Sequence, residues 1–338
     1  MSAYQIKTQV VGSYPVPSWL RAYPTAPNLR DAMLAVVKTQ ELAGIDIISD
    51  GELSRFDVNH PETNGMIEYF IKPMGGMSDQ ISREDWQQYQ QATGMQFRSK
   101  PPGMVTNSIH EGTLNLPEAW KSVKSLSTSS MMFTLTSPYM LAKTLHDRHY
   151  GDIKTLTNAI ARVLANQVAG IDAPMVQIDE ANLPGNVEDA SWAHEPINLV
   201  LNAIQGEKAL HLCFGNYGGQ SIQKGFWAHL IKFFNQLDVN HLVLEFARRG
   251  YDELEAFNDL RPDIKLGIGV VDIKDNEVES QDLIAKRVDH ATRVIGPERI
   301  GWIHPDCGFW MLPRTVADEK MKRLVLGRNL VEVANACH

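Results

Sequence analysis

The chain has 338 residues, of which 43% are hydrophobic and 21% charged, and its formal net charge is -8. This length is sufficient for a large core, whereas the net charge argues against nucleic acid or an anionic membrane as a partner, since both favour a basic face. The sequence contains only three cysteines, no apolar run of about 20 residues that could span a membrane and no signal-peptide pattern, so we expect a cytoplasmic protein without a disulfide framework.

Short apolar segments alternate along the chain with longer segments of helical periodicity. The predicted strands are residues 6–11, 45–49, 131–135, 175–178, 210–213, 242–244, 266–271 and 300–303. The predicted helices are residues 29–43, 153–168, 197–205, 222–237, 283–295 and 316–336. Nearly continuous apolar strands separated by helices indicate a parallel sheet that is covered on both faces. Eight such units predict an α/β fold of the (β/α)8 TIM barrel type, forming a single domain over residues 1–338.

One segment, residues 53–103, interrupts this alternation. It is polar, rich in Gln, Met and Gly, and too long for an ordinary loop between a strand and a helix. We interpret it as an insertion after the second strand, with a helix over residues 84–93, followed by a short extra strand or hairpin near residues 104–110. Because a barrel carries its active site at the carboxyl ends of its strands, we expect the insertion to lie over that face.

Polar or reactive side chains stand where the predicted strands end. They include Ser13, Glu52, Ser137, Asp179, His211, Cys213, Glu245, Lys274 and Cys307. A single polar residue at the end of a strand is unremarkable. The whole set is informative, because the carboxyl ends of the strands of a barrel meet on one face.

Four of these residues predict a metal site. His211 and Cys213 are two positions apart on one strand, so their side chains face the same side. Imidazole and thiolate are preferred ligands of zinc. This pair alone is weak evidence, because a buried cysteine is more often an apolar filler. The placement of Cys307 after the last strand and of Glu245 after the strand that follows His211 favours a zinc ion bound by all four residues.

The sequence also contains a series of motifs in a characteristic order. They are Val11-Gly12-Ser13-Tyr14-Pro15, Asp50-Gly51-Glu52, Asn64-Gly65-Met66-Ile67-Glu68-Tyr69-Phe70, Lys100-Pro101-Pro102, Gln177-Ile178-Asp179-Glu180, His211-Leu212-Cys213, Leu244-Glu245, Gly269-Val270-Val271-Asp272 and Pro305-Asp306-Cys307-Gly308. Over nearly its whole length the chain therefore resembles the C-terminal catalytic domain of cobalamin-independent methionine synthase, in its short, single-barrel form.

The resemblance implies a zinc-dependent methyl transfer to the thiol of homocysteine, which gives methionine. It implies that Ser13 and its backbone bind the carboxylate of homocysteine, and that Glu52 and Asp179 bind its ammonium group. Asp179 and Lys274 are the catalytic candidates. Lys274 stands in the segment where the family carries a proton-donating His, and it would assist the leaving group; the alternative is a surface lysine beside Asp272 and Asp275.

The methyl donor is where the sequence departs most from the family pattern. The family contacts folate through a Trp after the third strand and a Glu soon after the Gln-Ile-Asp-Glu motif. At these places the chain has Thr136-Ser137-Pro138 and Pro184-Gly185. We therefore expect methyl-folate to be a poor donor and a smaller donor, or methyl-cobalamin on a corrinoid partner protein, to fit better. Trp86, Tyr89 and Phe97 of the insertion are candidates for a substitute aromatic wall.

Three alternatives remain open at the level of sequence. Alkyl transfer to another thiol such as coenzyme M, as in the related epoxyalkane:coenzyme M transferases, would not need the ammonium contacts of Glu52 and Asp179. A zinc hydrolase would usually have three His or carboxylate ligands and a bound water. In a structural zinc site, the four ligands would more often lie close together in the sequence.

Overall fold

A curled parallel sheet forms the centre of the computed structural model, which describes residues 6–55, 57, 64–92, 101–215 and 224–336. Its seven strands run parallel to one another. In spatial order they are β1 (Lys7–Thr8), β10 (Ile300–Pro305), β9 (Lys265–Val271), β8 (His241–Leu244), β7 (Glu207–Leu212), β6 (Met175–Glu180) and β4 (Met132–Thr136). Because all strands point the same way, their carboxyl ends meet on one side of the sheet.

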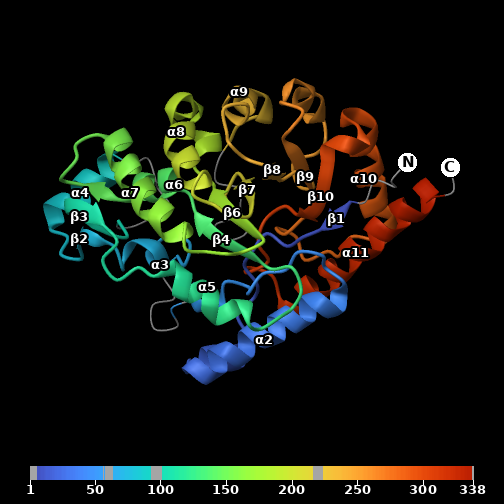
Figure 1. Ribbon diagram of the computed structural model, residues 1–338, viewed down its shortest axis with the longest axis horizontal. Helices are drawn as coiled ribbons and strands as arrows, with labels where there is room; N and C mark the ends of the chain where they lie inside the picture. The colour runs from blue at the N-terminus through green and yellow to red at the C-terminus, as the bar shows by residue number, and fades with distance from the viewer. Residues whose placement is uncertain (1–5, 56, 58–63, 93–100, 216–223, 337–338) are drawn as a thin grey trace.

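Helices surround the curled sheet, as Figure 1 shows. The α-helices are α1 (Ser18–Ala22), α2 (Ala26–Ala43), α3 (Glu68–Ile71), α4 (Arg83–Ala92), α5 (Leu116–Lys124), α6 (Pro138–Thr144), α7 (Ile153–Val168), α8 (Ala190–Leu201), α9 (Ile231–Phe234), α10 (Gln281–Ile295) and α11 (Arg314–Ala336). The short 3-10 helices are η1 (Leu53–Arg55), η2 (Leu183–Gly185), η3 (Val187–Asp189), η4 (Trp227–Leu230), η5 (Leu254–Asp259) and η6 (Pro297–Arg299). None of the helices formed by the described residues has the length and apolar character that a membrane crossing requires.

The two edge strands, β1 and β4, approach each other through a short extended segment. Ile47 bridges to Gln9 and Ile48 bridges to Met131, both in parallel orientation. The second predicted strand, residues 45–49, is thus reduced to two isolated bridges. The reason lies in Ser49, whose backbone N–H and C=O both bond to the side chain of Gln40, at 2.9 and 2.8 Å, instead of to a neighbouring strand.

A second, three-stranded sheet lies outside the main one. In it β2 (Gly75–Ser78) runs antiparallel to β3 (Met104–His110), and β3 runs parallel to β5 (His146–Asp147). Figure 1 shows this sheet and α4 beside α7, at one side of the molecule. Tyr89 of α4 is buried, and its hydroxyl donates to the carbonyl oxygen of Thr144 at 3.1 Å. The helix and the extra strand predicted for this part of the chain are therefore present as α4 and β3.

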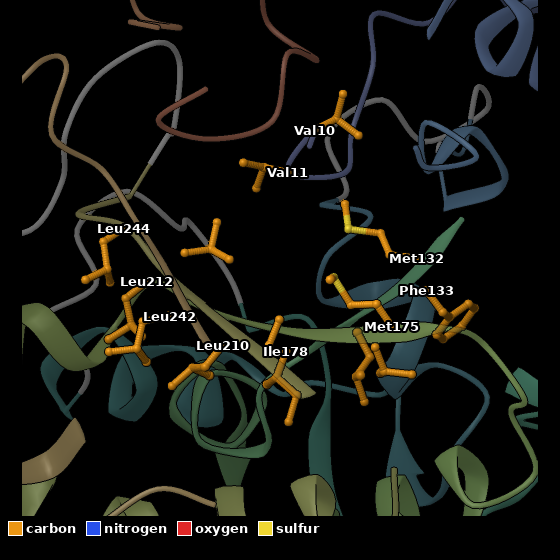
Figure 2. Close-up of a cluster of buried hydrophobic side chains, with 14 of the residues drawn as sticks. Val10, Val11, Met132, Phe133, Met175, Ile178, Leu210, Leu212, Leu242 and Leu244 are labelled. Atoms are coloured by element: carbon orange, nitrogen blue, oxygen red, sulfur yellow. The ribbon is translucent and has the colours of Figure 1, made fainter. Parts of the chain in front are cut away.

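The apolar core determines which side chains of the main sheet face inward. Leu210 and Leu212 of β7 pair in register with Leu242 and Leu244 of β8, and Figure 2 shows these four leucines close together. Successive side chains of a strand point to opposite faces. The same alternation that packs the leucines on one face therefore places His211 on the other.

Candidate metal centre and its surroundings

Three of the four predicted zinc ligands come together at the carboxyl ends of the strands. His211 is on β7, Cys213 follows that strand, and Cys307 follows β10. Their ligand atoms all lie within 4.8 Å of one another. The sulfur atoms of Cys213 and Cys307 are 3.9 Å apart. We call these three residues the ligand cluster.

The imidazole of His211 is oriented for metal binding. Its Nδ1 lies 2.9 Å from the carbonyl oxygen of Val243 and donates to it, which fixes the tautomer. The other ring nitrogen, Nε2, is buried and has no hydrogen-bond partner among the residues that the structure describes. A buried nitrogen without a partner costs about 1–3 kcal/mol, so this atom is available to bind a metal ion. With the two cysteines, the donor set fits a zinc ion.

Within the ligand cluster, the protonation of each residue affects the pKa of its neighbours. The Cys307 thiol and burial raise the pKa of Cys213 well above its ordinary value. Burial lowers the pKa of His211, but the neighbouring Cys213 and Asp179 outweigh it and raise the pKa to about 9. A bound cation requires a thiolate and a neutral imidazole, so metal binding at this cluster would release protons.

Glu245, the fourth predicted ligand, does not belong to the ligand cluster. It follows β8, but its carboxylate is outside the group of atoms that lie within 4.8 Å of one another. One oxygen, Oε2, lies 3.3 Å from the Nζ of Lys274, and the two side chains are 0% and 2% exposed. The other oxygen, Oε1, has no hydrogen bond to the described part of the chain.

The side chain of Lys274 is thereby buried next to the ligand cluster, so Lys274 is not a surface lysine. Burial lowers its pKa, but Glu245 and the sulfur atoms of Cys213 and Cys307 outweigh burial, so the pKa lies above the ordinary value. The side chain therefore stays cationic at neutral pH. The backbone N–H of Lys274 donates to the carboxylate of Asp272 at 2.8 Å, which fixes the start of this loop.

Asp179 lies beside the ligand cluster, because it pairs in register with His211 on the next strand. Its carboxylate accepts a hydrogen bond of 2.7 Å from the side chain of Gln177. Gln177 also donates to the carbonyl oxygen of Val11 at 2.7 Å, which ties β6 to the end of β1. Burial, and secondly the charge of Glu52, raise the pKa of Asp179 to about 7.

Glu52 has an unusual backbone conformation, with φ at 57°; no other non-glycine residue in the described ranges has a positive φ. Strain of this kind often marks functional sites. Its Oε1 accepts a hydrogen bond of 2.5 Å from the hydroxyl of Thr134 and lies 3.3 Å from the guanidinium of Arg55. A Cβ atom at position 12 would be only 2.3 Å from this oxygen, so Gly12 leaves room for the carboxylate.

Ser13 lies close to the loop that carries Cys307. The backbone C=O of Ser13 accepts a hydrogen bond of 2.8 Å from the N–H of Phe309. A Cβ atom at position 308 would be 2.0 Å from the Ser13 hydroxyl oxygen. The pairing of β1 with β10 thus brings the first and last predicted site residues together. We call Ser13, Glu52 and Asp179, the three residues for which the sequence analysis predicts contacts with the amino-acid part of a substrate, the amino-acid clamp.

The sequence analysis assigned no role to two residues of the site, Arg55 and Asp306. Arg55 is buried against Glu52 and the rings of Tyr69 and Phe70, yet it falls in a segment interpreted only as an insertion. Asp306 was noted only as part of a motif. Its carboxylate accepts hydrogen bonds from three successive N–H groups, those of residues 246, 247 and 248, at 2.7 to 2.9 Å. It therefore joins the loop of Cys307 to the loop of Glu245.

The end of β4, where the sequence departs from the family pattern, offers no aromatic side chain in Thr136, Ser137 or Pro138. Ser137 caps α6 by accepting from the N–H groups of Tyr139 and Met140. Of the three residues considered for a substitute wall, Tyr89 is buried, Trp86 is 38% exposed, and Phe97 lies outside the described residues.

The sequence and the fold are similar to those of known proteins. Residues 7–334 match the family model described as "Cobalamin-independent synthase, Catalytic domain". A methionine synthase of Saccharolobus solfataricus is 27% identical over 342 residues, which cover 96% of this chain and 95% of that protein. A methionine synthase of Sulfurisphaera tokodaii is 25% identical, with coverage of 96% and 92%.

Solved structures show the same fold. The structure of a B12-independent methionine synthase from Shewanella sp. W3-18-1 in complex with selenomethionine superimposes with a TM-score of 0.83 at 20% identity, covering 99% of this chain and 100% of the other. A putative vitamin-B12 independent methionine synthase from Listeria monocytogenes gives a TM-score of 0.69 at 18% identity, covering 97% and 99%. At these identities the likeness concerns the fold.

Proposed function

The chain belongs to the cobalamin-independent synthase catalytic-domain family, and on that premise we propose that it transfers a methyl group to the thiol of homocysteine, giving methionine. The observation that carries the proposal is the position of the ligand cluster beside the amino-acid clamp. Asp179 pairs in register with His211, and Ser13 lies against the residue that follows Cys307. A thiol and the ammonium and carboxylate of one small molecule would thus be bound together.

The proposed metal is zinc, held by His211, Cys213 and Cys307, with Glu245 nearby. Bound there, zinc would keep the substrate thiol, which alone has a pKa of about 8.5, in its deprotonated form. In the transfer, the sulfur of homocysteine forms a bond to the methyl carbon while the bond between that carbon and the donor breaks, and the thiol proton is lost to solvent.

The protein side chains supply orientation and charge. Glu52 and Asp179 would bind the ammonium group, and Ser13 would bind the carboxylate of homocysteine. Thr134 and Gln177 hold the two carboxylates in place by hydrogen bonds of 2.5 and 2.7 Å. Fixing the substrate in this way lowers the entropic part of the barrier. Lys274, cationic and buried, would assist the leaving group of the donor.

The fold proposed for this reaction is a closed barrel of a single domain. The two bridges at Ile47 and Ile48 support closure, because they link the edge strands β1 and β4 on either side of one segment. Closure matters for the site, since residues from the first and last strands then face those from the middle strands. The insertion proposed over residues 53–103 would contribute β2 to the second sheet, in which β2 pairs with β3.

The proposed donor is smaller than methyl-folate or is carried by a corrinoid partner protein. Support comes from the end of β4, where Ser137 is occupied in capping α6 and offers a pterin ring no surface for stacking. Of the aromatic residues considered for a substitute wall, the structure describes Trp86 and Tyr89. Trp86 is the one of these two that is partly exposed.

An assay with parallel donors tests both proposals. Purified zinc-loaded protein would receive homocysteine with methyl-folate, with methyl-cobalamin or with a simple methyl donor. We expect methionine with methyl-cobalamin and little with methyl-folate. Brisk turnover with methyl-folate and none with methyl-cobalamin would show the donor proposal to be wrong while supporting the substrate. Coenzyme M in place of homocysteine tests the alternative thiol, which has no ammonium group for Glu52 and Asp179.

A further inference from the structure

The proposed reaction gives no role to the motif formed by residues 64–70, yet this motif packs against Arg55. A Cβ atom at position 65 would be only 2.6 Å from the backbone oxygen of Arg55, so Gly65 lets the two segments approach closely. The guanidinium of Arg55 lies 5.4 Å from the ring centroid of Tyr69 and 5.1 Å from that of Phe70. A cation over two aromatic rings is attracted by both. The motif therefore forms a surface that holds Arg55.

The polar edge of the same guanidinium faces β4 and the amino-acid clamp. Its Nη2 donates to the carbonyl oxygen of Thr134 and, at 2.8 Å, to the hydroxyl oxygen of Thr134. Because that oxygen accepts from Arg55, its own proton is free to point at Oε1 of Glu52, to which it donates at 2.5 Å. Nη1 of Arg55 lies 3.3 Å from the same oxygen of Glu52. Arg55 thus contacts Glu52 directly and also through Thr134.

The backbone of Glu52 needs such support, because its φ of 57° is a conformation that side chains other than glycine rarely adopt. A strained residue keeps its conformation only where the surrounding structure determines it several times over. Arg55 belongs to the same turn, since its N–H donates to the carbonyl oxygen of Glu52 at 3.0 Å. Its contacts with Thr134 fasten this turn to β4.

The charge of Arg55 is buried together with that of Glu52. The two side chains are 6% and 9% exposed. Burial lowers the pKa of Arg55, but the charges of Glu52 and Asp50 outweigh burial, so the pKa lies above the ordinary value. Because taking two charges out of water is costly, a buried ion pair is a weak argument for stability alone. The place of this pair, at a carboxylate of the clamp, favours a role in substrate binding.

We propose that Arg55 is a positioning residue that directs the carboxylate of Glu52 toward the ammonium group of the substrate, and that residues 64–70 hold Arg55 in the place where it does so. The inference rests on the proposed binding of homocysteine by the clamp. Arg55 acts through Thr134 and Glu52. It therefore contributes to the selection of an amino-acid thiol over a thiol without an amino group, and not to the transfer step.

Arg55→Met removes the guanidinium but keeps an unbranched side chain over the two rings. Calorimetry with methionine, the proposed product, measures binding to the clamp in the zinc-loaded protein. We expect methionine affinity to fall about tenfold, as for the loss of a hydrogen bond to a charged group. The KM for homocysteine should rise accordingly and kcat should change less, while zinc content and the binding of a thiol without an ammonium group stay the same. Loss of a cation would by itself strengthen the binding of an ammonium, so a fall in affinity identifies a positioning effect.

Two further variants keep the charge of Arg55 or of its replacement but disturb its position. Arg55→Lys has a single ammonium in place of the planar fork that bonds both oxygens of Thr134. Gly65→Ala pushes on the backbone of Arg55. Both should weaken methionine binding, though less than Arg55→Met. Arg328→Met is the matched control, because Arg328 and Arg55 are both 8% exposed and Arg328 pairs with Asp46 at 2.8 Å. This control should lower the thermal stability but leave methionine affinity unchanged.

The comparison of these variants decides the inference. It is overturned if methionine affinity in Arg55→Met is unchanged or higher, or if Arg328→Met loses affinity to the same extent. If Arg55→Met does not fold, Arg55→Lys decides, and unchanged methionine affinity in that variant rejects the role of Arg55.

The same titrations separate this inference from the proposed function. Absence of methionine binding by the zinc-loaded wild-type protein would contradict the proposed function and the inference together. Binding that depends on Asp179 but not on Arg55 would keep the proposed function and reject only the role of Arg55.

Discussion

The ligand cluster and the amino-acid clamp differ in how their polar atoms are satisfied. In the first, Nε2 of His211 is buried without a partner in the part of the chain that the structure describes, and the two sulfur atoms face each other at 3.9 Å. In the second, Glu52 and Asp179 accept hydrogen bonds from Thr134 and Gln177. The ligand cluster therefore leaves a buried donor atom available to an external ligand, whereas the two carboxylates of the clamp are held in place by the protein itself.

The largest effect should follow from changes in the ligand cluster, which has no internal substitute for a lost ligand. Wild-type protein should carry about one zinc per chain. Cys213→Ala and Cys307→Ala should each lower zinc affinity by more than about 100-fold, beyond the losses caused by outer partners, and abolish methionine formation. Metal content by mass spectrometry checks this. Cys337→Ala is the matched control and should retain zinc; full occupancy in the two ligand variants would contradict the assignment.

A change in the clamp should act on one substrate group only. Asp179→Asn keeps the shape and the contact with Gln177 but removes the charge that would face the ammonium. We expect homocysteine affinity to fall about 10- to 100-fold, as for the loss of a hydrogen bond to a charged group. A thiol without an ammonium group should bind as before, and zinc content should not change. An equal loss for both thiols would mean that Asp179 does not bind the ammonium.

The same carboxylate should make amino-acid binding depend on pH. Burial and Glu52 raise the pKa of Asp179 to about 7, so the group is neutral below this pH and ionised above it. Because only the ionised form attracts an ammonium, methionine should bind more tightly as the pH rises toward 7, by at most about tenfold per pH unit. Calorimetry with methionine avoids the ionisation of a thiol. N-acetyl-methionine and the Asp179→Asn variant should both give flat profiles.

The smallest effect on homocysteine binding is expected from a change at the contact between the clamp and the loop of Cys307. Gly308→Ala would place a Cβ atom 2.0 Å from the Ser13 hydroxyl oxygen, so that Ser13 must shift. We expect a loss on the order of 1 kcal/mol of binding, roughly a fivefold higher KM for homocysteine. Gly301→Ala, on β10 itself, meets its nearest atom at 3.5 Å and is the control. Equal KM values for the two variants would argue against a contact of Ser13 with substrate.

Period and spacing predicted a barrel of eight parallel strands, and the structure shows a curled parallel sheet of seven. They also predicted the meeting of His211, Cys213 and Cys307, because it depends on the direction of the strands. Contacts between side chains that come from different loops could not be predicted from the sequence. The contact of Glu245 with Lys274, for example, joins side chains from two different loops and leaves no pattern in the sequence. The role of Arg55 likewise arises from packing between distant segments and leaves no local pattern.

The predicted bounds of two helices were wrong, because local sequence signals competed there with packing. The helix predicted over residues 197–205 begins earlier, because α8 (Ala190–Leu201) accommodates Pro196 in its interior. The helix predicted over residues 222–237 contains only η4 and α9 within its described part, residues 224–237. Neither difference affects the site, since both segments lie on the helical layer.

The pairing of β1 with β10 has a consequence for how the protein acquires activity. Lys7 pairs with Trp302, so this seam joins segments that are far apart along the chain. We expect it to close late in folding, because closing so long a loop has a high entropic cost. Ser13 reaches Gly308 only across this seam. A chain still emerging from the ribosome, or one that has lost its last strand, would fold much of its sheet yet have no complete binding site, so catalysis reports on the final step of assembly.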